Sequence, residues 1–236
     1  MLIYEDFSET SQIQASVFTP GFMFSTSEVL KRLMQLELDV FDGDPLVLPL
    51  PEDAPHEIPR ITLENKEKTF KLEVAPSRIN FFRSMTSEED RIIPNDFVQV
   101  AGKTLTSLLD KMGAQCGRIA AVVNRFAFKG DPGKEIAAHF CKDNFLREPF
   151  DQPSEFELHS LKKYDFFGSF KVNSWVRIKS GQMKFVKGLS RPVVVALQDI
   201  NTLAEETESY SMEQITSFYE KICDEFDKVL RLYFPK

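Results

Sequence analysis

The sequence has little of the chemistry that marks the common enzyme and metal-binding classes. It contains three His and three Cys, without a Cys-x-x-Cys pair. It also lacks the loops G-x-x-x-x-G-K-[ST] and G-x-G-x-x-G and the nucleophile elbow G-x-S-x-G, which position phosphates or a nucleophile. None of the histidines has a second ligand at metal-binding spacing. We therefore expect no metal, no cofactor and no catalytic residue that the sequence alone can identify.

The sequence also lacks a long apolar run. No run approaches the ~20 residues that a membrane-spanning helix needs, and the first residues, MLIYED, do not resemble a secretory signal. Cys116, Cys141 and Cys223 are isolated and odd in number, which is typical of free thiols in a reducing compartment. We expect a cytoplasmic protein that does not bind membranes.

Charge is unevenly distributed along a chain whose net charge is −7. Residues 118–191 carry 14 basic and 8 acidic side chains, a net charge of +6. Basic side chains interleaved with aromatic rings can hold single-stranded nucleic acid. An ordinary solvated surface is favoured, because a pI near 5.2 is unusual for a nucleic-acid binder. The candidate basic and aromatic face consists of Lys162, Lys163, Lys171, Trp175, Arg177, Lys179 and Lys184.

Hydrophobic periodicity predicts the same order of elements twice, β-α-β-β-β-α, in residues 16–112 and again in 119–234. The first strand is expected from Ser16 to Phe24, with a bend at Pro20-Gly21. Asp131 and Ser211 are predicted N-caps, and Gly113 is predicted to end a helix.

Residues 41–59 contain five prolines, which exclude a helix or a central strand. We expect an extended surface arm whose Leu46, Leu48 and Leu50 alternate onto the core.

These patterns predict an α+β fold. Two duplicated units, residues 1–117 and 118–236, are expected to form one compact domain. Their strands would share a twisted, mainly antiparallel sheet with four helices packed on one face.

Arg78, Asn80, Asp199 and Asn201 are polar residues on or beside predicted central strands. A polar side chain there must be paired or must line a cleft, because burying it alone costs free energy. The pattern predicts a pair between Arg78 and Asp199 across the two halves, or all four residues in a cleft. We favour a structural pair that fixes the docking of the halves, since such pairs also have the features of a site.

Three segments carry a resemblance to known proteins: residues 59–63 (PRITL), residues 72–81 (LEVAPSRINF) and residues 199–202 (DINT) before the final helix. Together they resemble a sporadically distributed family of uncharacterised bacterial and archaeal proteins of similar length. The resemblance implies a prokaryotic cytoplasmic protein and an association with mobile or defence-associated gene sets. It supplies no catalytic residues.

We expect a protein that works by binding rather than by catalysis. Helices on one side of the sheet would leave the other face to a ligand, a second subunit or a protein partner. A protein partner or self-association is the leading hypothesis. Two alternatives stay open: a nucleic-acid-associated module that uses the basic 118–191 block, and an enzyme with a site in a cleft between the halves.

Overall fold

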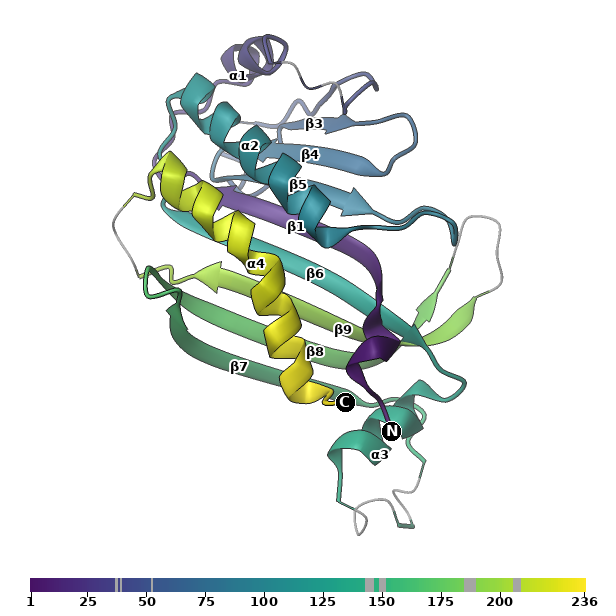
Figure 1. The fold of residues 1–236 in the computed structure, drawn as a ribbon. Helices are drawn as coiled ribbons and strands as arrows, with labels where there is room; N and C mark the ends of the chain where they lie inside the picture. The colour runs from purple at the N-terminus through teal and green to yellow at the C-terminus, as the bar shows by residue number, and fades with distance from the viewer. Residues whose placement is uncertain are drawn as a thin grey trace.

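The computed structural model describes residues 1–36, 38, 40–51, 53–142, 147–148, 152–184, 190–205 and 209–236. Its centre is a nine-stranded antiparallel sheet with the order β2-β3-β4-β5-β1-β6-β9-β8-β7 (Figure 1). The strands are β1 (Glu9–Phe18), β2 (Leu46–Val47), β3 (Ile61–Glu64), β4 (Phe70–Ala75), β5 (Arg78–Ser84), β6 (Arg118–Phe128), β7 (Glu157–Phe166), β8 (Phe170–Met183) and β9 (Arg191–Thr202). The helices are η1 (Tyr4–Phe7), α1 (Thr26–Leu33), α2 (Pro94–Met112), α3 (Pro132–Phe140) and α4 (Met212–Tyr233). The predicted α+β class and antiparallel sheet are confirmed.

The order of strands is arranged in the same way on both sides of the central β1–β6 pair. On one side β1 pairs with β5, which is followed by β4 and β3, and on the other side β6 pairs with β9, which is followed by β8 and β7. Apart from the short β2, both parts of the chain give the element order β-α-β-β-β-α. Pairing between β1 and β6 therefore joins the two parts into one continuous sheet.

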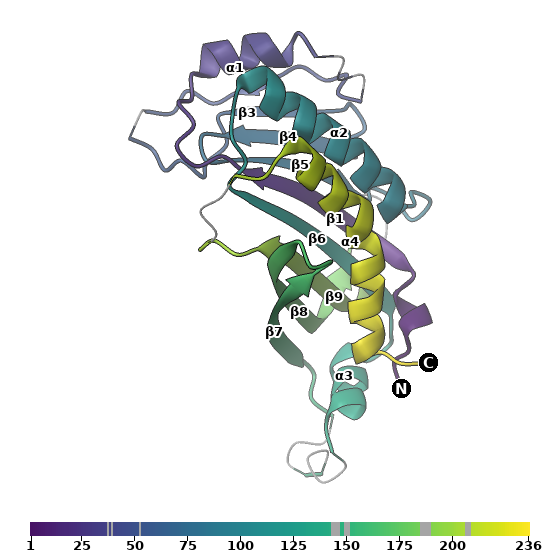
Figure 2. The same ribbon diagram turned by 60° about the vertical axis from the view of Figure 1, so that its left-hand side comes forward.

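Helices α2 and α4 lie side by side over one face of the sheet (Figures 1 and 2). Gly102 of α2 faces the side chain of Tyr219 on α4, and a Cβ at this position would lie at an ordinary contact distance of 3.5 Å from it. Ile13, Val17 and Phe81 belong to the core cluster beneath these helices. The prediction placed all four helices on this face. The structure shows α2 and α4 there, with α1 packed against α2 and α3 packed against β8 and β9.

Local signals fix several helix ends, as the sequence predicts. The carboxylate of Asp131 accepts a hydrogen bond from the backbone amide of Lys134 at 3.4 Å. Ser211 and Gln214 form a reciprocal capping box at the start of α4. Gly113 ends α2 in the left-handed conformation, with φ of 63°, which glycine adopts without steric cost.

Two expectations about the first part of the chain are wrong. The first strand begins at Glu9 and ends at Phe18, so Pro20-Gly21 forms the turn after the strand and not a bend within it. In the proline-rich arm, Leu46 and Leu50 are 55% and 37% exposed. They do not enter the core because this part of the arm lies at the sheet edge, where β2 pairs only with β3.

Within the described ranges, no helix has both the length and the apolar character needed to cross a bilayer. All three cysteines are free, with Cys116 and Cys223 buried and Cys141 half-buried.

Candidate functional site

Side chains alternate across each strand, so half of them point away from α2 and α4. We call this second surface the open face. Figure 2 shows that neither α2 nor α4 reaches it. Strand registers place the following residues on its centre: Gln12, Gln14, Ser16 and Phe18 of β1, Arg78, Asn80 and Phe82 of β5, Arg118, Ala120, Val122 and Asn124 of β6, and Leu197, Asp199 and Asn201 of β9.

A row of paired residues crosses the middle of the open face. Ser16 pairs with Asn80 on one side and with Ala120 on the other, and Ala120 pairs with Asn201. The two asparagines are 3% and 4% exposed. Two buried amides therefore flank the central strand pair at matching positions.

Asn80 is the centre of the first hydrogen-bond network. Its Oδ1 accepts a hydrogen bond from Ser16 Oγ at 2.8 Å and a longer one from Gln14 Nε2 at 3.4 Å. Its amide nitrogen donates to Glu73 Oε2 at 3.5 Å, and Glu73 forms an ion pair with Lys71 at 2.8 Å. The network joins β1, β4 and β5 on the open face.

Asn201 is the centre of the second network. Its Oδ1 accepts hydrogen bonds from Arg118 Nη2 and from Asn173 Nδ2, the latter at 3.2 Å. Its own amide nitrogen donates to Asp199 Oδ1 at 2.8 Å. Arg118 also donates to the backbone oxygen of Thr202 at 2.9 Å. This network joins β6, β8 and β9, as the first joins β1, β5 and β4.

Asp199 is the acidic group of the second network. Burial raises the pKa of its carboxyl, although the hydrogen bond from Asn201 and the charges of Arg118 and Arg177 oppose the shift. Burial exceeds these favourable contacts because desolvation penalises the charged form. Asp199 is therefore a polar group that the fold keeps at a cost.

The predicted pair between Arg78 and Asp199 is not formed. Two strands, β1 and β6, lie between β5 and β9, which separates their backbones by about 14 Å at the usual strand spacing. Arg78 and Asn80 instead lie on one side of the open face, and Asp199 and Asn201 lie on the other. The enzyme hypothesis built on these four residues stays a prediction.

The predicted basic and aromatic face is formed in part. Trp175 of β8 pairs with Asp199 of β9, and β7 pairs with β8 on the other side. These registers place five of the seven predicted residues on the open face, namely Lys163, Lys171, Trp175, Arg177 and Lys179. Lys162 points to the opposite side, because it neighbours Lys163 on the same strand and lies 5.7 Å from the ring of Tyr164. Lys184 follows the end of β8. The guanidinium of Arg177 lies 5.7 Å from the ring of Trp175.

Four central residues of the two networks are not among the sequence candidates: Gln14, Ser16, Arg118 and Asn173. A signal for the first two exists in the alternation of Gln12, Gln14 and Ser16 with the apolar Ile13, Ala15 and Val17, which is typical of a strand with one polar face. Arg118 lies at the first position of β6, so its role depends on strand pairing that no local pattern reveals.

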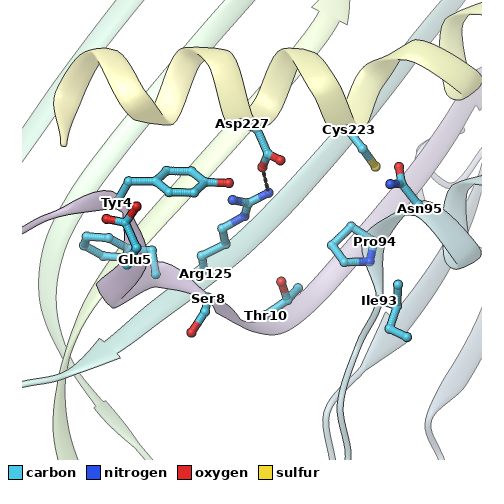
Figure 3. A pocket seen from close by; sticks show the side chains of 11 residues that line it. Tyr4, Glu5, Ser8, Thr10, Ile93, Pro94, Asn95, Arg125, Cys223 and Asp227 are labelled. Atoms are coloured by element: carbon cyan, nitrogen blue, oxygen red, sulfur yellow. Dashed lines mark hydrogen bonds and ion pairs between the residues drawn. The ribbon is translucent and has the colours of Figure 1, made fainter. Parts of the chain in front are cut away.

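A pocket of about 320 Å³ lies on the helix-covered side, between η1, the start of α2 and α4 (Figure 3). Arg125 of β6 enters it and donates from Nη2 to Asp227 Oδ1 at 2.6 Å. Burial raises the pKa of the Cys223 thiol to about 12, so this lining group stays protonated at neutral pH. Arg125 is paired with Asp227 through Nη2, although its buried Nε has no partner among the described residues, and the Cys223 thiol is protonated. The open face carries two networks of buried polar groups and is the stronger candidate site.

Comparisons with known proteins leave the site to be interpreted on its own geometry. No protein-family model matches the chain. No significant similarity to a curated protein is found.

Proposed function

We propose that the protein works by binding a partner, most simply another protein, on the open face of its sheet. The two amide networks carry this proposal, because they place buried hydrogen-bonding groups on a face that α2 and α4 leave uncovered. Rings of Phe82 and Trp175 and the exposed guanidinium of Arg177 surround them. Arginine and aromatic side chains around satisfied polar groups are typical of protein interfaces.

Unused hydrogen-bonding capacity in the same region supports the proposal. Arg78 Nε and Asn173 Oδ1 are buried and have no partner among the described residues. Leaving such groups unpaired costs about 1–3 kcal/mol each. Both atoms lie below the accessible surface, so a partner would remove this cost only if its docking moved the covering side chains and supplied an acceptor to Arg78 and a donor to Asn173.

Native affinity capture from the host tests the proposal with two matched charge reversals. Arg177→Glu changes an exposed residue of the open face, and Lys103→Glu changes an exposed residue of α2 on the helix-covered side. We expect a stoichiometric protein to co-purify with the wild type and with Lys103→Glu, and to be lost with Arg177→Glu. Equal recovery with both variants, or no partner with the wild type, would contradict the proposal.

Nucleic acid is a second candidate because five basic or aromatic residues share the open face. Trp175 is the only tryptophan, so its fluorescence reports directly on this surface. Stacking of a base should quench it when single-stranded oligothymidine is added at low salt, and the apparent affinity should fall steeply as salt rises. Unchanged fluorescence at low salt would remove this candidate.

We also infer that the two parts of the chain arose as copies of one β-α-β-β-β-α unit and that all four helices belong to one side of the sheet. The matching strand order on both sides of the β1–β6 pair supports the duplication. Co-expression of residues 1–117 and 118–236 as separate chains should give a stable complex through β1 and β6. Failure of the two parts to associate would count against independent units.

The resemblance described above supports a prokaryotic cytoplasmic setting and an association with mobile or defence genes. Fractionation of host cells and a survey of the neighbouring genes in several genomes test the two parts of this proposal separately.

A further inference from the structure

The two edges of the sheet differ in a way that points to self-association. At one edge β2 has two residues. At the other edge β7 has ten residues, and it pairs with β8 from Glu157 to Phe166 without a bulge. Within the described chain, no strand pairs with the outer side of β7. Its outward amides and carbonyls form a template for another strand, since the segment contains neither proline nor glycine.

Side-chain alternation limits how a second copy could pair with this edge. Residues that face each other across two strands must point to the same side of the sheet. Glu157, His159, Leu161, Lys163 and Asp165 belong to the open face, because their partners on β8 include Lys179, Arg177 and Trp175. An antiparallel dimer about a two-fold axis therefore has only a few registers.

Charge selects one of these registers. With the axis at Leu161, Glu157 would face Asp165 of the partner subunit, and with the axis at Lys162, two lysines would face each other. With the axis at Ser160, Glu157 faces Lys163 of the partner subunit twice, once on each side of the axis. Opposite charges directly across two strands are favourable and like charges are unfavourable.

Neither member of this charge pair is held firmly within its own subunit. Glu157 contacts His159 at 2.6 Å, but both side chains are about half exposed. Lys163 lies 3.7 Å from Glu205, and their side chains are 57% and 71% exposed. Exposed ion pairs of this kind contribute little to stability. Replacing them by contacts between the two subunits therefore costs little free energy.

We propose that two copies of the chain pair antiparallel through β7 about a two-fold axis at Ser160. The dimer joins the two sheets edge to edge and places Lys163, Trp175 and Arg177 of each copy on one extended surface. This inference does not depend on the proposed function, because it concerns the edge of the sheet and not a ligand on its face.

Light scattering after gel filtration tests the dimer, with an expected mass of twice 27.1 kDa. Each single reversal, Glu157→Lys or Lys163→Glu, turns two attractive contacts into repulsive ones and should weaken dimerisation about tenfold. The double variant should recover the wild-type affinity to within a few-fold. Lys162→Glu is the matched control, because Lys162 points to the other side of the sheet and should leave the affinity nearly unchanged.

A cysteine at the axis tests the register independently. Ser160→Cys should form a disulfide between subunits under mild oxidation, since it faces its own copy across the strand pair. Leu161→Cys faces His159 of the partner subunit and should cross-link poorly, and the wild type controls for the three native cysteines. The proposal would be overturned if the protein stayed monomeric up to roughly 100 μM, well above a micromolar Kd. Efficient cross-linking through Leu161→Cys in place of Ser160→Cys would also overturn it.

Discussion

The two faces of the sheet use the same strands for different purposes, and neighbouring residues of β5 show the difference. Phe81 points toward the helices, is fully buried and packs against the rings of Phe41, Phe70 and Phe97. Phe82 points to the open face, where it is half-buried and the ammonium of Lys71 lies 4.7 Å from its ring. The covered face therefore holds the fold together by apolar packing. The open face carries groups that are suited to recognition.

Polar groups also behave differently on the two faces. On the covered face, Arg125 is paired with Asp227, and Tyr219 donates from its hydroxyl to the backbone oxygen of Ser16 at 2.9 Å. On the open face, polar side chains form the two continuous networks around Asn80 and Asn201. Buried polar groups of the covered face make separate contacts between the sheet and α4, whereas those of the open face are linked along neighbouring strands. Changes on the two faces should therefore separate stability from binding.

The largest expected effect is a difference in the free energy of unfolding between variants of the neighbouring residues Phe81 and Phe82. Phe81→Ala should reduce the free energy of unfolding by about 3–5 kcal/mol, because it removes a fully buried ring and leaves a cavity. Phe82→Ala should cost less than about 1.5 kcal/mol, since a half-buried ring on the open face leaves no closed cavity. Urea unfolding of both variants measures the difference. Equal losses would mean that the open face belongs to the core.

A smaller effect is expected at the hydroxyl of Tyr219. This hydroxyl reaches β1 and β6 from the covered side, and the pKa of the buried Tyr219 lies well above its usual value because of burial. Tyr219→Phe should lower the free energy of unfolding by about 1–2 kcal/mol through the lost hydrogen bond, and it should leave partner capture unchanged. A loss of capture with unchanged unfolding would show that the covered side takes part in binding.

The smallest expected effect is a gain in the free energy of unfolding, and it concerns Asp199 on the open face. The pKa of Asp199 is raised above its ordinary value of 3.8 by burial. Its contribution to stability is thus present below that value and is lost as pH rises through the pKa of the folded state. Asp199→Asn keeps an oxygen that can accept from Asn201, so it should be slightly more stable than the wild type at neutral pH.

Thermal unfolding at several pH values measures this difference. The advantage of Asp199→Asn should shrink as the pH falls through the raised pKa of the folded state, and it should be largely gone below 3.8, where the wild-type carboxyl is neutral in the folded and the unfolded chain. A variant that is less stable at neutral pH would show that Arg118 and Arg177 outweigh burial.

Much of the fold follows from local patterns in the sequence. Alternation predicts the hairpin of β3 and β4, and helical spacing predicts α2 and α4. Gly113 marks the end of α2, and Ser211 marks the start of α4. Residues 9–15 of β1 are missed because they are mostly polar and their apolar residues alternate singly. A strand that exposes one face to recognition has a weaker hydrophobic signal than a strand of the core.

The candidate site could be predicted only in part. Polarity on central strands indicates Asn80 and Asn201, and the structure shows both amides buried and hydrogen-bonded. The partners themselves depend on which strands lie next to each other. β1 and β6 come between Arg78 and Asp199, and this order is set by pairing between residues that are distant in sequence.

Lysine footprinting of the captured complex tests the central claim most directly. Lys163 and Lys179 lie on the open face, and Lys103 and Lys111 lie exposed on α2. Acetylation rates of all four, measured by mass spectrometry with and without the partner, compare the two faces in one experiment. The account predicts that acetylation of Lys163 and Lys179 slows in the complex while that of Lys103 and Lys111 is unchanged. Protection of the α2 lysines alone would contradict it.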